Sequence, residues 1–173
     1  HSSNHLWGLY YDMEAEYYDA LLNGAYDAQS EEEVNILQML FTSIDHAIRY
    51  MRKSRKPNSK QFLAKYLLSK ANIMIRSFPE DKVRIRELID SAKKLVQEYT
   101  LEYSDVRTTY NMACAWYYTL TEPDYKRTIE FIQEAYEIAK NTTTTELDDI
   151  DYIIVPCANM LVECEKYDDA ATW

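Results

Sequence analysis

The chain has 173 residues, of which 47% are hydrophobic, and carries a formal net charge of −10. Its only glycines are Gly8 and Gly24, which argues against a sheet protein because strands joined by tight turns use glycine far more often. The negative charge argues against nucleic acid or an anionic membrane as the main partner, and no run approaches the ~20 apolar residues of a membrane span. We expect one all-α domain over residues 6–173, preceded by a disordered tag remnant at residues 1–5.

Apolar residues at helical spacing, separated by capping and proline signals, predict seven helices. In chain order they cover about 6–23, 31–56, 58–77, 80–99, 106–118, 125–140 and a segment that begins near Thr145. Pro156 lies inside the last segment, so we expect a kink or a restart there. An eighth helix is cut short at Trp173, and we expect either a longer protein or another chain to cover that end.

Small residues recur on these helices at regular intervals. The predicted helices form successive pairs, and the second helix of each pair has an alanine late in its length: Ala47, Ala92 and Ala135. Three alanines on the first helices of the pairs are separated by similar numbers of residues. The interval is forty-odd residues, roughly the length of one helical pair. The first-helix positions are Ala71, Ala113 and Ala158. We expect neighbouring helices to approach closely at these alanines.

The stretch from Asp105 to Lys140 contains the most specific motif. Tyr110-Asn-Met-Ala113 is followed by a short turn at Leu120–Asp124 and then by Ala135-Tyr136 on a second helix. This order resembles the tetratricopeptide repeat (TPR), and a second copy begins near Ile154. The interval exceeds the usual ~34 residues, as in the TPR-like domains of bacterial pheromone receptors, and HEAT-type helix pairs have a similar period.

The TPR resemblance implies an α-α superhelix of seven to eight antiparallel helices with a peptide-binding concave groove. Amide side chains in such a groove form hydrogen bonds with an extended peptide backbone, and Arg or Lys side chains bind a carboxylate of the peptide. The positions that match the groove are Lys65, Asn72, Arg76, Arg107, Tyr110, Asn111, Cys114, Tyr117, Tyr118, Tyr152, Asn159 and Glu163. The alternative is that these tyrosines cover helix seams and the charges solvate the surface.

We therefore expect a non-catalytic scaffold that binds a protein or peptide partner. The alternatives are a sensor domain of a peptide-responsive bacterial regulator and an assembly element that self-associates through its C-terminal end. TPR domains that hold the acidic tail of heat-shock chaperones are similar at Asn72 and Asn111. They need cations where this chain has Leu68, Tyr152 and Pro156, so we do not expect that ligand.

Neither an enzyme nor a cofactor is expected. Two isolated glycines cannot form a phosphate-binding loop, and His46 lacks the second ligand that a metal site requires. The basic run Arg49–Lys56 is interpreted as the cationic end of a helix, with docking to nucleic acid or an acidic protein as the alternative. Three cysteines, Cys114, Cys157 and Cys164, are interpreted as small buried hydrophobes of a reduced, cytoplasmic protein.

Overall fold

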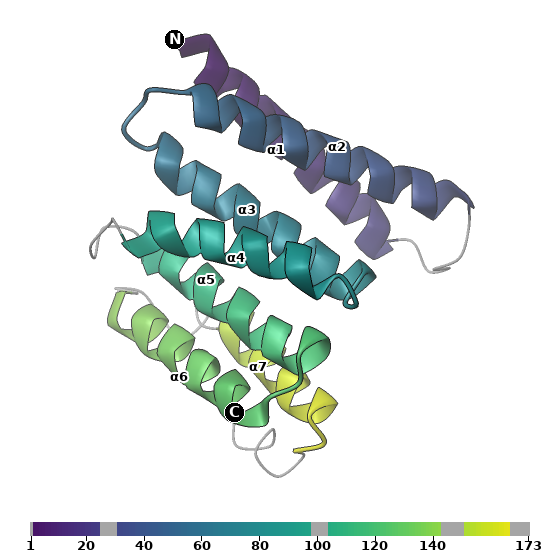
Figure 1. Cartoon of the computed structure of the whole chain (residues 1–173), viewed down its shortest axis with the longest axis vertical. Coiled ribbons are helices and arrows are strands. Elements are labelled where there is room, and N and C mark those ends of the chain that lie inside the picture. Colours follow the sequence, from purple (N-terminus) through teal and green to yellow (C-terminus); the bar gives the residue numbers. More distant parts are fainter. Residues whose placement is uncertain (1, 25–30, 98–103, 143–150, 167–173) are drawn as a thin grey trace. The chain divides into compact units, whose positions relative to one another are not determined.

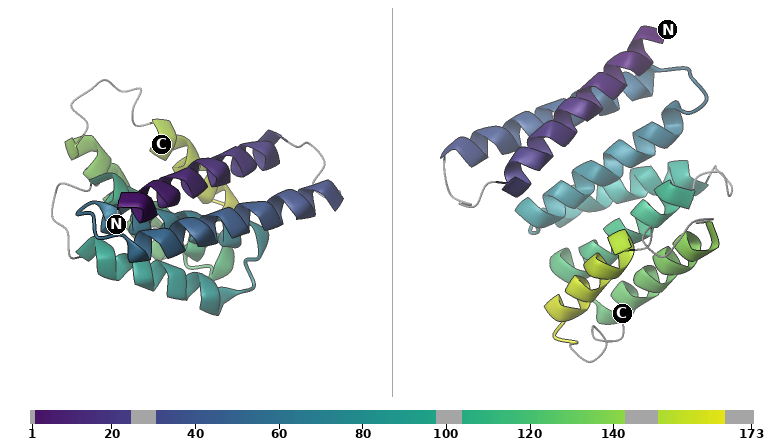
Figure 2. Two further views of the ribbon diagram at one scale, coloured as in Figure 1. Left: turned by 90° about the horizontal axis from the view of Figure 1, so that it is seen from above. Right: turned by 180° about the vertical axis from the view of Figure 1, so that it is seen from behind.

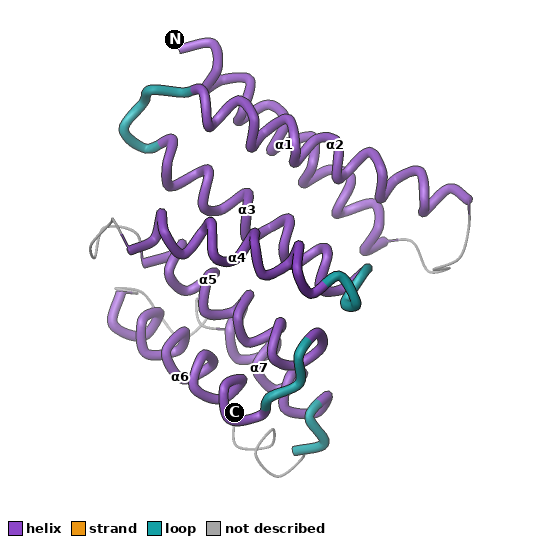
Figure 3. Tube along the Cα trace, viewed as in Figure 1, coloured by secondary structure: helices purple, strands orange, loops and turns teal. Residues whose placement is uncertain are grey.

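The computed structural model describes residues 2–24, 31–97, 104–142 and 151–166, which form α-helices and a π-helical turn but no strand (Figure 1). Figure 3 shows the same helical character along the Cα trace. The helices are α1 (Ser2–Gly24), α2 (Glu31–Lys53), α3 (Ser59–Ser77), α4 (Lys82–Gln97), α5 (Ser104–Trp116), α6 (Tyr125–Thr142) and α7 (Asp151–Glu163). The predicted all-α class is confirmed. A superhelical, TPR-like stacking of these helices stays a prediction.

The helices match the predicted ranges closely, with a difference at the N-terminal end. Residues 2–5, which we expected to be disordered, belong to α1. The reason is local packing, because the buried His5 ring meets Phe62 edge-on at 5.6 Å and its Nδ1 lies 3.2 Å from Ser59 Oγ. Burial, and then the charge of Lys56, lowers the pKa of His5. The predicted eighth helix and the end near Trp173 lie outside the described residues.

The chain divides into two compact units, His1–Lys70 and Ala71–Trp173, and the boundary falls inside α3. In the first unit α1 and α2 pack against each other as an antiparallel pair (Figure 1). Gly8 permits the close approach, because a Cβ at this position would lie only 2.8 Å from Met51 Cε. Half-buried His46 packs its ring against Tyr11 at 4.7 Å, as expected of a helix-packing residue.

In the second unit α5 packs against α4, α6 and α7, and α6 also packs against α7 (Figure 2). Their buried core includes Ile132, Met160 and Leu161. Of the six alanines that we expected at close contacts, five are almost fully buried, and Ala158 is only half-buried because its neighbour Cys157 takes the inward position on α7. The five buried positions are Ala47, Ala71, Ala92, Ala113 and Ala135.

The turn between α5 and α6 is shorter than predicted. Instead of ending before Leu120, α5 continues as a π-helical turn over Tyr117–Thr121, closed by a 2.9 Å bond from the Glu122 amide to the Tyr117 carbonyl. Pro123 cannot continue the helix, and Asp124 then caps α6 by accepting a 3.2 Å bond from the Arg127 amide. Only residues 122–124 therefore connect the two helices.

A larger side chain at Ala135 should destabilise the second unit. Ala135 has no exposed surface, so Ala135→Leu would have to push α6 away from its neighbours. We expect the free energy of unfolding to fall by about 1–3 kcal/mol, measured by urea denaturation followed by circular dichroism. The control is Gln133→Leu on the exposed side of the same helix, which should change it by less than about 0.5 kcal/mol. Equal effects at the two positions would contradict close packing at Ala135.

Candidate functional site

Three of the predicted groove residues come together on one side of α5. Arg107, Tyr110 and Asn111 line a cavity of about 420 Å³. Their spacing of three and four residues places them on one helical stripe. The remaining lining residues come from the flanking helices, with Lys93 and Val96 on α4 and Phe131 and Glu134 on α6.

The apolar wall of the cavity is held by ring contacts. Phe131 stacks on Tyr118 with centroids 5.8 Å apart and planes within 7° of parallel. Tyr110 meets the same Phe131 ring edge-on at 6.4 Å. Arg127 lies over the outer face of Tyr118, 4.9 Å from its centroid, and its Nη1 donates a 2.7 Å hydrogen bond to the tyrosine hydroxyl. The wall is therefore formed by rings with fixed neighbours, which limits the entropy lost when a ligand is bound.

The polar side of the cavity carries two cations and one anion. Arg107 Nη2 lies 4.0 Å from Glu134 Oε1, at the outer limit of an ion pair, and both side chains are partly exposed. A pair of this kind contributes little to stability, and its guanidinium keeps donors for a further acceptor. Lys93 is exposed at the same cavity. Asn111 is buried at the wall, so its amide is the least mobile polar group of the lining.

Two titratable groups at the cavity, Tyr110 in its lining and Cys114 beside Tyr110, are neutral at physiological pH. Burial, reinforced by the neighbouring Cys114, raises the pKa of Tyr110 far above its ordinary value. Burial also raises the pKa of the Cys114 thiol to about 12, against a smaller opposite effect of the Tyr110 hydrogen bond. A thiol with this pKa is not a nucleophile near pH 7.

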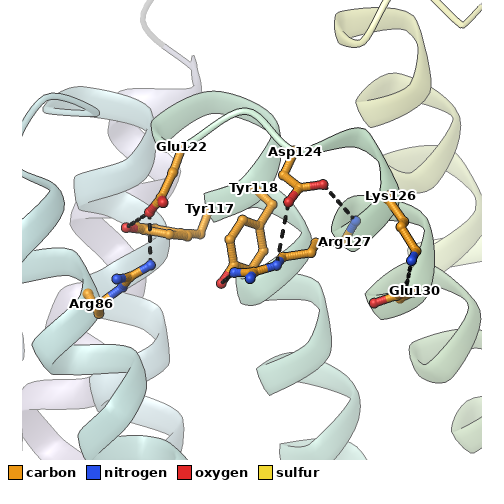
Figure 4. Close-up of polar contacts among 8 residues, drawn as sticks. All are labelled: Arg86, Tyr117, Tyr118, Glu122, Asp124, Lys126, Arg127 and Glu130. Atoms are coloured by element: carbon orange, nitrogen blue, oxygen red, sulfur yellow. Dashed lines mark hydrogen bonds and ion pairs between the residues drawn. The ribbon is translucent and has the colours of Figure 1, made fainter.

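Tyr117 does not face the cavity. It is buried, and its hydroxyl donates a 2.8 Å bond to Glu122 Oε2, which also accepts a 2.8 Å bond from Arg86 Nη2 (Figure 4). The Arg86 guanidinium lies over the Tyr117 ring at 5.5 Å. Burial, followed by the Glu122 hydrogen bond, raises the pKa of Tyr117. Tyr117 therefore joins α4 to the α5–α6 turn. This contact agrees better with a tyrosine that covers the seam between helices than with one that lines a peptide-binding groove.

Of the other predicted groove residues whose side chains are described, none lines this cavity. Lys65, in the first unit, lies 3.5 Å from Glu16 Oε1 and 3.8 Å from Asp12 Oδ2. On α3, Asn72 has a buried Oδ1 with no hydrogen-bond partner among the described residues, and Arg76 is exposed. On α7, Asn159 and Glu163 are exposed and the side chain of Tyr152 is outside the description.

Four of the seven lining residues lie on the second helices α4 and α6, and none of these four was predicted from the sequence. Phe131 and Glu134 share a stripe of α6, and Lys93 and Val96 share one of α4, but neither stripe carries a motif. Their role depends on which sides of α4 and α6 face α5. Two residues of the basic run, Arg52 and Lys53, form the last turn of α2, in agreement with the helix-end interpretation, and docking of the run to a partner stays a prediction.

Among the described residues there is no cluster of His, Cys, Asp and Glu that could hold a metal ion. None of the helices in the described ranges is long and apolar enough to cross a membrane. Comparison of the chain with protein-family models, curated proteins and solved structures finds no match.

Removing the Tyr117 hydroxyl should destabilise the junction. Tyr117→Phe leaves Glu122 bonded to Arg86 but removes a partly buried hydrogen bond. We expect the free energy of unfolding to fall by about 1–2 kcal/mol in chemical denaturation, because the acceptor is charged. Tyr118→Phe is the matched neighbour and removes only an exposed bond to Arg127, with an effect below about 0.5 kcal/mol. If Tyr118→Phe proved the more damaging, the assigned role of Tyr117 would be wrong.

Proposed function

We propose that the chain is a non-catalytic interaction module whose second unit binds an acidic peptide segment at the cavity between α4, α5 and α6. The observation that carries the proposal is the convergence of Lys93, Arg107 and Asn111 on one cavity with an aromatic wall. The two cations select a carboxylate side chain, and the amide offers both a donor and an acceptor to a peptide backbone. A TPR-like origin of the site would agree with this use of α5.

The size of the cavity limits what is bound there. About 420 Å³ accommodates one or two side chains rather than a whole folded surface. A ligand carboxylate would take the place of Glu134 beside Arg107, where the existing 4.0 Å pair is loose. The rings of Tyr110 and Phe131 would contact the apolar part of the same side chain. We therefore favour a Glu or Asp next to an apolar residue as the recognised element.

A binding role is preferred to catalysis because of the protonation states at the cavity. The thiol of Cys114 and the hydroxyl of Tyr110 both have pKa values raised by burial, so neither provides a base or a nucleophile near pH 7. The acidic and basic side chains of the lining, Lys93, Arg107 and Glu134, are of the types that hold a ligand by ion pairing.

Peptide binding can be tested with fluorescein-labelled hexapeptides that alternate Glu with Leu, against the same peptides with Lys in place of Glu. We expect saturable anisotropy for the acidic series only, weakening as salt is raised. Arg107→Gln and Lys93→Gln should each weaken binding by about tenfold or more, since charge-assisted hydrogen bonds contribute about 1.5–3 kcal/mol.

The matched control is Lys94→Gln, which removes an exposed cation from the next position of α4, outside the cavity lining. It should change the dissociation constant by less than about twofold, because exposed charges further away are screened by salt. Equal losses at Lys93 and Lys94 would indicate attraction by general charge, and the absence of saturable binding to the acidic series would refute the proposed ligand class.

A further inference from the structure

Helix α1 exposes large apolar side chains and has small residues among its buried positions. The positions buried toward the rest of the first unit include small ones, Gly8 and Ala15, whereas the outer side carries large apolar side chains. Six of these are between 39% and 70% exposed, and they follow one stripe at helical spacing. The exposed stripe consists of Leu6, Trp7, Tyr10, Met13, Tyr17 and Leu21.

The exposed stripe is symmetric about its middle. If a second α1 is laid alongside in the opposite direction with Met13 next to the twofold axis, Leu6 meets Leu21 and Tyr10 meets Tyr17. The same register sets the bulky Trp7 against Ala20, which is small and exposed. An isologous dimer needs a surface that is complementary to itself in this sense.

The charged residues of α1 do not prevent a second copy of the chain from packing on the exposed stripe. Helix α1 has no Lys or Arg, and its acidic side chains turn to partners in their own chain. Glu14 Oε2 accepts a 2.6 Å bond from Ser43 Oγ, and Asp12 and Glu16 lie within 4 Å of Lys65 Nζ. The absence of cations on α1 also argues against an anionic lipid surface as the occupant.

The size and rigidity of the stripe suit a dimer. With aromatic side chains of about 150–250 Å² each, its exposed fractions correspond to roughly 600–700 Å² per chain, close to the ~800 Å² per partner of a standard stable interface. Trp7 is held by ring contacts with Tyr10, Tyr11 and Tyr50 at 5.7–6.2 Å. A tryptophan fixed in this way loses little entropy on burial and is typical of a binding hot spot.

We propose that the chain forms a homodimer through an antiparallel pairing of the exposed stripe of α1 with the same stripe of a second copy. Met13 lies beside the twofold axis and Trp7 packs over Ala20 of the second copy. The dimer uses the first unit only, so it does not depend on peptide binding by the second unit.

Analytical ultracentrifugation of the full chain over roughly a hundredfold range of concentration tests the association. We expect a monomer–dimer equilibrium for the wild-type chain and a monomer for Met13→Glu, which sets two carboxylates against each other at the axis. The control is Val83→Glu, an equally exposed apolar position on α4, which should leave the dimer intact. Circular dichroism establishes that each variant retains its helical content.

Disulfide crosslinking tests the register, in a Cys164→Ser background that removes the half-buried native thiol. Oxidised Met13→Cys should give a covalent dimer, and Leu6→Cys should crosslink to Leu21→Cys in a mixture more readily than either does alone. Val83→Cys should stay monomeric.

Several outcomes would overturn the proposal. These are a wild-type monomer throughout the range, a dimer that survives Met13→Glu, or crosslinking that is no faster at Met13→Cys than at Val83→Cys. A monomer that floats with neutral phosphatidylcholine vesicles, and loses that binding in Met13→Glu, would assign the stripe to lipid instead.

Discussion

The close approach of α5 to its neighbours is the constraint on which the second unit depends. Ala113 on α5, Ala92 on α4 and Ala135 on α6 have no exposed surface, so these helices lack bulky side chains where they are most tightly packed. A short side chain lets two backbones come together, whereas the rings of Tyr110 and Phe131 on the same helices need more room. The cavity lies beside those rings, so its position follows from where small and large residues alternate along α5.

The two adjacent tyrosines at the start of the π-helical turn have different neighbours. Tyr117 points to Glu122 and Arg86, and Tyr118 points to Arg127 (Figure 4). Tyr118 also stacks on Phe131, so one turn of chain is tied to both α4 and α6. Successive residues of a helix point about 100° apart, so two adjacent side chains face different neighbours. This explains why tyrosines predicted to line a common groove have different partners.

The two units differ in how they use apolar surface. The second unit buries its alanines against neighbouring helices, whereas α1 presents aromatic and aliphatic side chains outward and packs small residues inward. A helix that is apolar on both sides has little amphipathic signal, so its sequence alone does not show which side is inside. Gly8 and the buried His5 settle the orientation, through contacts with Met51 and Ser59.

The sequence by itself determined the all-α class, the approximate helix boundaries and the burial of five of the six alanines, because periodicity, capping residues and proline act over a few residues. The TPR resemblance also placed Arg107, Tyr110 and Asn111 among the groove positions of one helix, and all three line the same cavity. Only the tertiary structure showed that Lys93 and Glu134 line the same cavity as these residues. It also showed that Tyr117 donates a hydrogen bond to Glu122 and that Lys65 forms an ion pair with acidic residues of α1. Those contacts join residues of different helices, and which faces of two helices meet depends on the packing of all their side chains together.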